Sequence, residues 1–250
     1  MRRLLPALLA LLAWVGAAHA DPDALWRIAS QKCVPNEREY GQPSPCAKVD
    51  IEGGEARGYV ILKDLVGDTQ YLLIPTAKVT GIEDPALLAP DAANYFAAAW
   101  RERDFTDAAA TRPLSRDELS LAVNSAHGRS QNQLHIHIDC IAPAVRDAVL
   151  RNAAKIGESW APFPEPLAAH PYRAIRVGGE ELDGFNPFVR LAADVPGARE
   201  AMGQETLAVV GTSFDGKPGF VVLAGHADAA TGNPGSSEEL QDHSCALARP

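Results

Sequence analysis

The chain has 250 residues, of which 46% are hydrophobic and 22% are charged, and its formal net charge is −9. A chain of this length and composition can bury a core of its own, as one domain or as two small ones. The negative charge excludes a general electrostatic attraction to nucleic acid, so we expect no nucleic-acid partner.

The first 20 residues have the order of a secretory signal. Arg2 and Arg3 precede an uncharged apolar stretch, 4–18, which ends in small residues before Asp21. This stretch of about 15 residues is shorter than the ~20 that a membrane-spanning helix needs. We therefore expect export with cleavage after Ala20. The alternative is an uncleaved anchor that tethers the same globular part to the membrane.

Four cysteines follow this segment, and an even number in an exported chain predicts two disulfides. Three pairings are possible. A local bridge between Cys33 and Cys46 is the simplest, and Cys140 with Cys245 would then tie the middle of the chain to its C-terminal segment. A zinc site is the alternative, but the cysteine spacing contains no Cys-x-x-Cys pair.

Residues 21–158 read as alternating strands and helices. Apolar residues at helical spacing predict helices over 21–33, 86–103 and 143–155. β-rich runs predict a hairpin of 58–63 and 70–74, ended by Pro75, and a second strand pair, 119–123 and 133–141, around the polar loop 124–132.

A proline-rich bridge, 160–166, leads to a second half, about 167–250. This half is predicted to contain a strand at 172–177, a helix at 186–202, a hairpin of 207–212 and 219–223, and a helix at 236–248. The order of elements roughly repeats that of the first half, about 21–158. The second half has no His-x-His, so it is interpreted as a degenerate repeat within one domain, 21–250.

Two histidines stand two residues apart in the apolar run 131–140. Alternate side chains of a strand share a face, so His135 and His137 project together. This arrangement suits a nucleophile with a helper. A metal site that adds Asp139 from the same face is a rival interpretation, and two satisfied, half-buried side chains are the plainest one.

The loop before this strand has the composition of an anion-binding segment. Gly128, the hydroxyl of Ser130 and several amides lie close together in the sequence, so backbone and side-chain donors can converge on an anion. An imidazole can attack phosphorus and be released again by water, which splits one displacement into two. We therefore expect a phosphate group as the ligand.

With these motifs the chain resembles the histidine-triad (HIT-like) superfamily of nucleotide hydrolases and transferases, whose motif is His-φ-His-φ-His-φ-φ. The corresponding residues here are Gln133-Leu134-His135-Ile136-His137-Ile138-Asp139, preceded by Gly128-x-Ser130. The hairpin is also similar, with Leu62-Lys63-Asp64 followed by Tyr71-Leu72-Leu73-Ile74-Pro75. The resemblance implies an α+β fold, in which helices flank an antiparallel sheet.

Beyond this core the chain is similar to one family, the bacterial CDP-diacylglycerol diphosphatases. The similar elements include Cys33-Val34-Pro35-Asn36, Pro45-Cys46-Ala47, Gln131-Asn132-x-x-His135, Trp160-x-Pro162 and Gln241-Asp242-His243-x-Cys245. The resemblance implies hydrolysis of CDP-diacylglycerol to CMP and phosphatidate at the periplasmic face of the inner membrane. It implies no cofactor and no metal, contact with the membrane surface, and a possible homodimer.

The resemblance also assigns roles to residues. His135 is expected to attack the phosphate on the cytidine side and to form a CMP-histidine intermediate, with His137 beside it. The expected substrate-binding residues are Asp64, Asn124, Gly128, Ser130, Gln131 and Gln133. Gln133 departs from the pattern, because it stands where the motif has its first histidine and an amide cannot act as an acid or base near neutral pH.

Other residues are interpreted as structural. Asp242 and His243 are expected to serve the fold beside Cys245, and His170 and His226 give no functional signal. Tyr95, Phe96 and Trp100 stand at helical spacing and are expected in the core, with an acyl-chain entrance as the alternative. Two other functions stay open: hydrolysis or transfer on a soluble nucleotide diphosphate, and nucleotide or lipid binding without catalysis.

Overall fold

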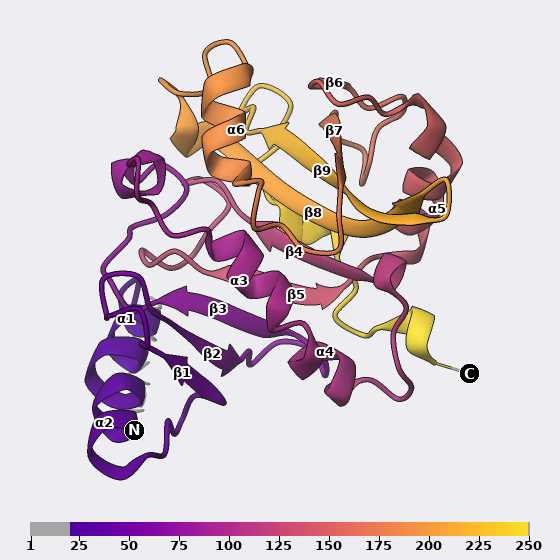
Figure 1. Ribbon diagram of the computed structural model, residues 1–250. Helices are drawn as coiled ribbons and strands as arrows, with labels where there is room; N and C mark the ends of the chain where they lie inside the picture. Colours follow the sequence, from indigo (N-terminus) through magenta and orange to yellow (C-terminus); the bar gives the residue numbers. More distant parts are fainter. Residues whose placement is uncertain (1–20, 250) are drawn as a thin grey trace, which may run out of the picture.

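One nine-stranded antiparallel sheet runs through the protein (Figure 1). The computed structural model describes residues 21–249, so the predicted signal at 1–20 lies outside the described residues. The strand order is β1-β2-β3-β5-β4-β8-β9-β7-β6. Helices flank this sheet, so the predicted α+β class is confirmed. Within residues 21–249, no helix combines the length and apolar character needed to cross a membrane.

The strands of the first half follow the sequence closely. Their bounds are β1 Lys48–Asp50, β2 Tyr59–Lys63, β3 Tyr71–Pro75, β4 Leu119–Val123 and β5 Ile136–Cys140. Both predicted strand pairs are confirmed. The edge strand β1 was not predicted, because its three residues are too few to show an alternating apolar pattern. β5 begins at Ile136 rather than Gln133, because its pairing with β3 reaches only to Leu73 opposite Ile136.

The second half supplies β6 Ala161–Pro162, β7 Arg173–Gly178, β8 Glu205–Phe214 and β9 Lys217–His226. The predicted hairpin is confirmed and extends further than the apolar runs indicated. Its turn places both Asp215 (φ 51°) and Gly216 (φ 74°) in the left-handed region, as a two-residue hairpin turn requires. β4 pairs with β8, so both halves share one sheet.

The strand order supports the predicted repeat. The first half runs β2-β3-β5-β4 and the second runs β6-β7-β9-β8, and the third strands in sequence, β4 and β8, meet at the centre. The face that carries the histidines in the first half carries Val221 and Leu223 in the second, packed against Val145 and Val149. The repeat itself stays a prediction, which this correspondence favours.

The N-terminal helix is longer than predicted. It consists of α1 Ala24–Ile28, the π-helix η1 Ala29–Cys33 and α2 Val34–Tyr40, so it extends to Tyr40. Pro35 lies within this continuous helix, directly after the π-helical segment, whose wider turn loosens the ladder that the proline ring would obstruct. The prediction that the helix ends at Cys33 was wrong.

The predicted helix over 86–103 was wrong in a different way. The segment divides into the 3-10 helix η2 Pro85–Leu88, then α3 Tyr95–Arg101, and α4 Asp104–Ala109 follows. Asn94 starts α3 afresh, because its side chain accepts a hydrogen bond from the Ala97 amide at 3.1 Å.

The later helices are mostly shorter than predicted. α5 Pro143–Asn152 continues into the 3-10 helix η4 Ala153–Lys155, as expected, whereas α6 Pro187–Asp194 stops before Pro196. The remaining 3-10 helices are η3 Arg116–Glu118, η5 Met202–Gln204, η6 Ser237–Leu240 and η7 Ala246–Ala248.

The helix predicted over 236–248 was wrong, since only η6 and η7 form there. The segment between them pairs with the end of β5 instead: Gln241 bridges to Ile141, and the Asp242 amide donates to the Cys140 carbonyl at 2.9 Å. Its backbone hydrogen bonds therefore go to the sheet rather than to a helix.

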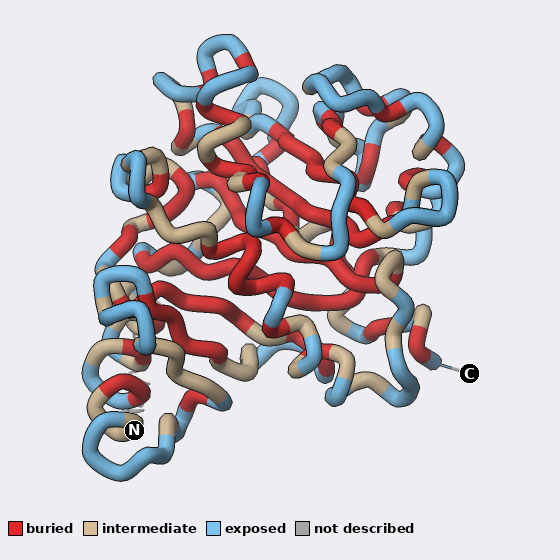
Figure 2. The backbone as a smooth tube through the Cα atoms, viewed as in Figure 1, coloured by how far each residue is buried: buried red, intermediate tan, exposed pale blue. Residues whose placement is uncertain are grey.

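Two layers of side chains enclose the sheet. On one face Phe96 and Trp100 of α3 pack with Phe188 of α6 in the main core, and α3 lies in front of the strands in Figure 1. The opposite face is covered by α1 to α2 at one end and by α5 at the other. Figure 2 shows that the strands are buried and that exposed residues lie mainly in the outer loops.

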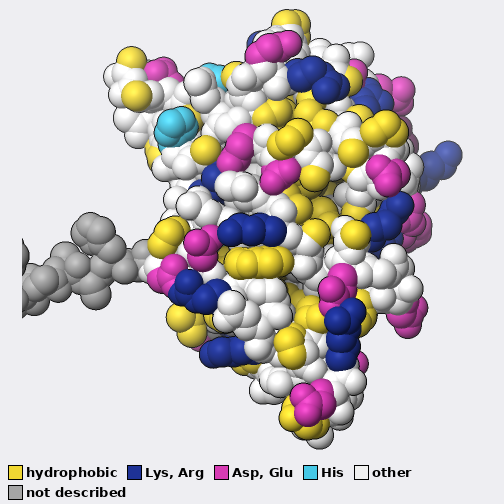
Figure 3. Space-filling view, turned by 90° about the vertical axis from the view of Figure 1, so that its left-hand side faces the viewer, with side chains coloured by type: hydrophobic (Ala, Val, Ile, Leu, Met, Phe, Trp, Pro, Cys, Tyr) yellow, Lys and Arg dark blue, Asp and Glu magenta, His cyan; other side chains and the backbone are white. Residues whose placement is uncertain are grey.

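The disulfides Cys33–Cys46 and Cys140–Cys245 both form, as predicted. Two disulfides favour an oxidising compartment and therefore an exported chain. On the face drawn in Figure 3, basic and acidic side chains are interspersed with apolar ones.

Candidate functional site

A cavity of about 610 Å³ lies on the histidine face of the sheet, between α1 and the C-terminal segment. It brings together seven of the eight residues predicted for the site: Asp64, Asn124, Gly128, Ser130, Gln131, His135 and His137. Gln133 does not line it. Several further lining residues are apolar: Ala24, Leu25, Ile28, Pro45, Leu62, Leu65, Val66 and Leu72. The cavity therefore combines a polar end with an apolar wall.

His135 is held in one tautomer. Its Nδ1 lies 2.8 Å from the carbonyl oxygen of Gln133, which can only accept a hydrogen bond. Nδ1 therefore carries the ring proton, and Nε2 keeps a lone pair. Burial lowers the pKa of His135, and this outweighs the Gln133 carbonyl and the charges of Glu238 and Asp64, which act in the opposite direction. The ring is thus a neutral nucleophile at neutral pH.

His137 is fixed by Gln70. The Gln70 Nε2 lies 2.5 Å from Nδ1 of His137, 3.1 Å from Asp64 Oδ2 and 3.3 Å from Glu238 Oε1, so its two N–H groups are shared among three acceptors. When the Gln70 amide donates to Nδ1, that nitrogen accepts and Nε2 carries the ring proton. Nε2 is buried and has no partner among the described residues. Burial, and then the neighbouring His135, lower the pKa of His137, so this ring is neutral too.

Gln133 has a structural position. Its amide donates to the carbonyls of Pro75 at 3.0 Å and Ala77 at 2.8 Å, and its Oε1 accepts from the Val79 amide at 3.3 Å. The side chain is fully buried and continues the pairing of the chain where the β3 to β5 ladder has ended. This explains the replacement of the motif's first histidine: three backbone groups are satisfied by one amide, which an imidazole cannot do.

The loop after β4 is fastened to the C-terminal segment. The Gly128 amide is used locally by Ser125, and a Cβ at Gly128 would approach the Gly235 carbonyl to 2.8 Å, so glycine is needed for this close packing. Asn124 donates to Glu238 Oε2 at 3.0 Å. Ser130 is exposed at the cavity and lacks a side-chain hydrogen bond to any residue within 21–249.

Asp64 and Gln131 line the cavity and form hydrogen bonds at its rim. Asp64 accepts from the Val66 amide at 3.2 Å in the β2–β3 turn and from Gln70. Gln131 accepts from the Leu25 amide at 3.2 Å and donates to the Asp21 carbonyl at 3.0 Å. The first described residues are thus tied directly to the cavity.

Two residues near the histidines were missed by sequence reasoning. Glu238 lines the cavity, and its Oε1 lies 3.5 Å from His137 Nδ1. His243 bridges two carboxylates, with Nδ1 2.7 Å from Asp139 Oδ2 and Nε2 3.4 Å from Glu238 Oε1. Hydrogen bonds to Asp139 and then to Glu238 raise the pKa of His243 to about 10. The interpretation of His243 as a mere neighbour of Cys245 was therefore too narrow.

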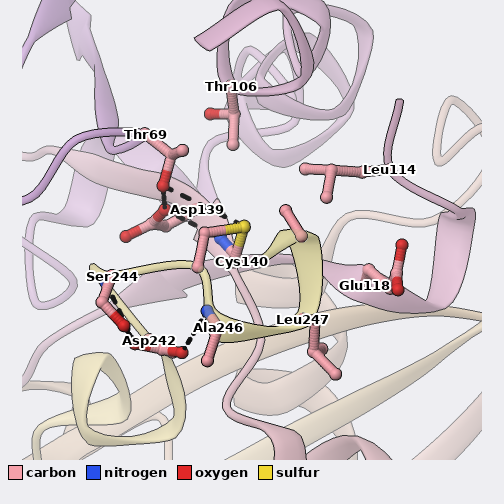
Figure 4. The surroundings of a disulfide bond; sticks show 12 residues. Thr69, Thr106, Leu114, Glu118, Asp139, Cys140, Asp242, Ser244, Ala246 and Leu247 are labelled. Atoms are coloured by element: carbon pink, nitrogen blue, oxygen red, sulfur yellow. Dashed lines mark hydrogen bonds between the residues drawn. A yellow bond between two sulfur atoms is a disulfide. The ribbon is translucent and has the colours of Figure 1, made fainter. Parts of the chain in front are cut away.

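Glu238 stays ionised despite its burial. Burial alone would raise its pKa, but hydrogen bonds from His243, Asn124 and Gln70 outweigh burial and lower it. Figure 4 shows Asp139 beside the Cys140–Cys245 disulfide with its second oxygen bonded to Thr69, at 2.6 Å. The sequence contained one signal for the contact between Asp139 and His243. Asp139 directly precedes Cys140, and His243 stands two residues before Cys245, the disulfide partner of Cys140.

The described residues do not form the alternative metal site that includes Asp139. Asp139 shares the face of His135 and His137, but its carboxylate does not point toward them. It accepts hydrogen bonds from His243, Thr69 and the Cys140 amide instead. Within residues 21–249, no group of three or more His, Cys, Asp or Glu side chains is placed to hold a metal ion. The buried cation at the cavity, Arg129, pairs with Glu83 at 2.6 Å.

This site defines a class of protein. A neutral imidazole with a free Nε2, a neighbouring imidazole N–H and a cavity with polar and apolar parts are typical of an enzyme that displaces groups at phosphorus. The family model of CDP-diacylglycerol pyrophosphatase matches residues 20–249. The chain belongs to this family, and it is an enzyme that hydrolyses the phosphoric anhydride of CDP-diacylglycerol.

Proposed function

We propose that the chain hydrolyses CDP-diacylglycerol to CMP and phosphatidate through a covalent intermediate on His135. The observation that carries this proposal is the hydrogen bond from His135 Nδ1 to the Gln133 carbonyl, which leaves the Nε2 lone pair available at the cavity. Because burial lowers the pKa of His135, the attacking form prevails at neutral pH.

The first step requires no acid. The Nε2 lone pair forms a bond to the phosphorus on the cytidine side, and the bond from that phosphorus to the bridging oxygen breaks. The electron pair leaves with phosphatidate, a phosphate monoester whose second pKa is about 6 and which departs as an anion. This accounts for a site in which Gln133, which cannot donate a proton as an acid, replaces a histidine.

His137 supports this displacement as a hydrogen-bond donor. Its Nε2–H is buried without a partner among the described residues, and a phosphate oxygen is the kind of acceptor it lacks. A donor fixed before the substrate binds stabilises charge that develops on phosphate oxygens. Water then attacks the phosphorus, the bond to Nε2 breaks, and CMP is released. The water loses its proton to solvent.

The experiment is CMP release from CDP-diacylglycerol in detergent micelles, combined with rapid quenching after substrate labelled in the cytidine. We expect His135→Ala to abolish release and labelling, and the wild-type protein to carry the label on His135. His127→Ala is the matched control, because His127 lies in the same loop region but outside the cavity lining. Full activity of His135→Ala would refute the proposal.

The apolar wall favours the lipid over a soluble nucleotide diphosphate. Leu25, Ile28 and Leu62 line the same cavity as His135, and such a wall suits acyl chains. If a soluble CDP-alcohol were hydrolysed as fast as CDP-diacylglycerol, the alternative substrate class would be favoured. Binding without turnover would instead favour the non-catalytic alternative.

We also propose that the mouth of the cavity faces a membrane, at the periplasmic side of the inner membrane. Leu65 is fully exposed and Val66 largely so, and both line the cavity at the β2–β3 turn. Gln131 at the rim donates to the Asp21 carbonyl, so the first described residue lies beside the cavity. The homodimer stays a prediction.

The membrane proposal is tested with vesicles that contain CDP-diacylglycerol and with a water-soluble short-chain analogue. The double variant Leu65→Asp and Val66→Asp should lower kcat/KM on vesicles and leave the analogue unaffected. Leu150→Asp, at an exposed leucine on α5, is the control that should change neither. Equal losses on both substrates would show that the turn acts on the chemistry rather than on docking.

A further inference from the structure

The segment 236–245, here called the C-terminal strap, brings two charged residues into the site. Glu238 stands on η6 and lines the cavity that His135 lines, although the two are 103 residues apart in sequence. Glu238 is held on both oxygens: Oε1 faces Gln70 and His243, and Oε2 accepts from Asn124. Its carboxylate therefore has a fixed orientation inside the cavity.

His243 connects this carboxylate to a buried one. Asp139 is fully buried, and its oxygens accept from Thr69, from the Cys140 amide and from His243. His243 contacts this carboxylate through Nδ1 at 2.7 Å and reaches Glu238 with Nε2 at 3.4 Å, and the two contacts raise the pKa of His243 to about 10. Acidic and basic side chains therefore alternate along the row from Asp139 to His243 to Glu238.

A carboxylate in a cavity that binds phosphate groups is unfavourable for substrate binding, so Glu238 must have another function. An ionised Glu238 repels the phosphates of the substrate, so it does not contribute to their binding. The group that a fixed carboxylate does orient is a neutral donor, and the water of the second step is one. The first step needs no carboxylate, because imidazole attacks and an anion leaves.

We infer that Glu238 orients the water that hydrolyses the His135 intermediate, and that His243 and Asp139 are positioning residues that hold Glu238 in place. This inference rests on the proposed function. The water oxygen bonds to phosphorus, the bond from phosphorus to His135 Nε2 breaks, and its electron pair returns to the imidazole. The water loses its proton to solvent, and Glu238 fixes the orientation of the water as a hydrogen-bond acceptor.

The test separates the two steps by a pre-steady-state burst. Glu238→Gln keeps the shape and the Asn124 contact but removes the charge. We expect phosphatidate release in a normal burst, a kcat lowered about 100-fold, and labelled His135 that accumulates. His243→Gln should do the same on a scale of about tenfold, the size of one charged hydrogen bond. KM should fall with kcat, because the second step is slowed.

His170→Gln is the matched control. His170 pairs with Glu239 at 2.9 Å, so it fastens the same strap one residue away and does not line the cavity. If His243 served only to fasten the strap, both variants would lose activity equally, and the inference would fail. It would also fail if Glu238→Gln removed the burst, which would place Glu238 in the first step or in substrate binding.

The two proposals fail in different ways. If no label appears on His135 of the wild-type protein, the covalent mechanism is wrong and the strap has no intermediate to act on. If the label appears and decays at the wild-type rate in Glu238→Gln, the covalent mechanism stands and only the inference about the strap is wrong. Urea unfolding of each variant shows whether a loss of activity reflects a loss of fold.

Discussion

Replacement of Gln133 by leucine should destabilise the protein and leave its chemistry intact. The substitution removes the partners of the Pro75 and Ala77 carbonyls and of the Val79 amide. At ~1.5 kcal/mol for each buried group left without a partner, the loss is about 4.5 kcal/mol, and burial of the leucine side chain returns about 1.5 kcal/mol. The free energy of unfolding should therefore fall by about 3 kcal/mol.

This change is measured by urea unfolding, followed by tryptophan fluorescence, and by CMP release without urea. A domain with a stability of ~5–15 kcal/mol stays mostly folded after such a loss, so kcat should remain within a factor of about three. Gln131→Leu is the comparison, because it removes two hydrogen bonds at the less buried rim and should cost less. Unchanged stability with activity lowered more than about tenfold would refute the reasoning and assign Gln133 to substrate binding.

Three further predictions concern the cysteines and the histidines. Loss of the Cys140–Cys245 disulfide, which closes 105 residues, should lower the free energy of unfolding by about 4.7 kcal/mol, against about 2.9 kcal/mol for Cys33–Cys46, which closes 13. Only the serine variants of Cys140 and Cys245 should also lower kcat. Equal effects of both disulfides on kcat would contradict this prediction. The acid limb of kcat/KM should lie below pH ~6.5, because the lowered pKa of His135 keeps it neutral there; a limb above that value argues against His135. Protonated His243 stabilises the fold, and because its pKa is raised, this stabilisation is complete below pH ~6.5 and is lost as pH rises through about 10. The free energy of unfolding in urea should therefore differ most between His243→Gln and the wild type at low pH, and the two should converge above pH about 10.

The strands were predictable from the sequence where one face is buried and local pattern decides. β4 has the predicted bounds, and the alternation over 133–141 placed His135 and His137 on one face. The errors arose where tertiary contacts outweigh local preference. The segment 236–248 carries a helix-start signal, yet its amides pair with the end of β5, and no pattern within the segment indicates this partner.

The same limit applies to the site. Residues of one loop and one strand could be grouped from sequence, because their spacing fixes the face on which they lie. Glu238 meets Gln70 across 168 positions of sequence, and His243 meets Asp139 across 104. Such contacts follow from the sheet order and from the disulfide, and neither is fixed by local sequence. The partners of Gln133 likewise lie at the end of β3 and just beyond it, and local sequence does not indicate them.

The Cys140–Cys245 bond also sets an order of events in the maturation of the chain. The bond that locks the strap covalently cannot form until the second half has been synthesised and has reached a compartment in which disulfides form. A chain that is still reduced already contains His135 and its strand, but the strap is not locked against them. On the inference drawn above, full turnover is acquired last, so the protein is restrained from consuming its lipid before it is exported.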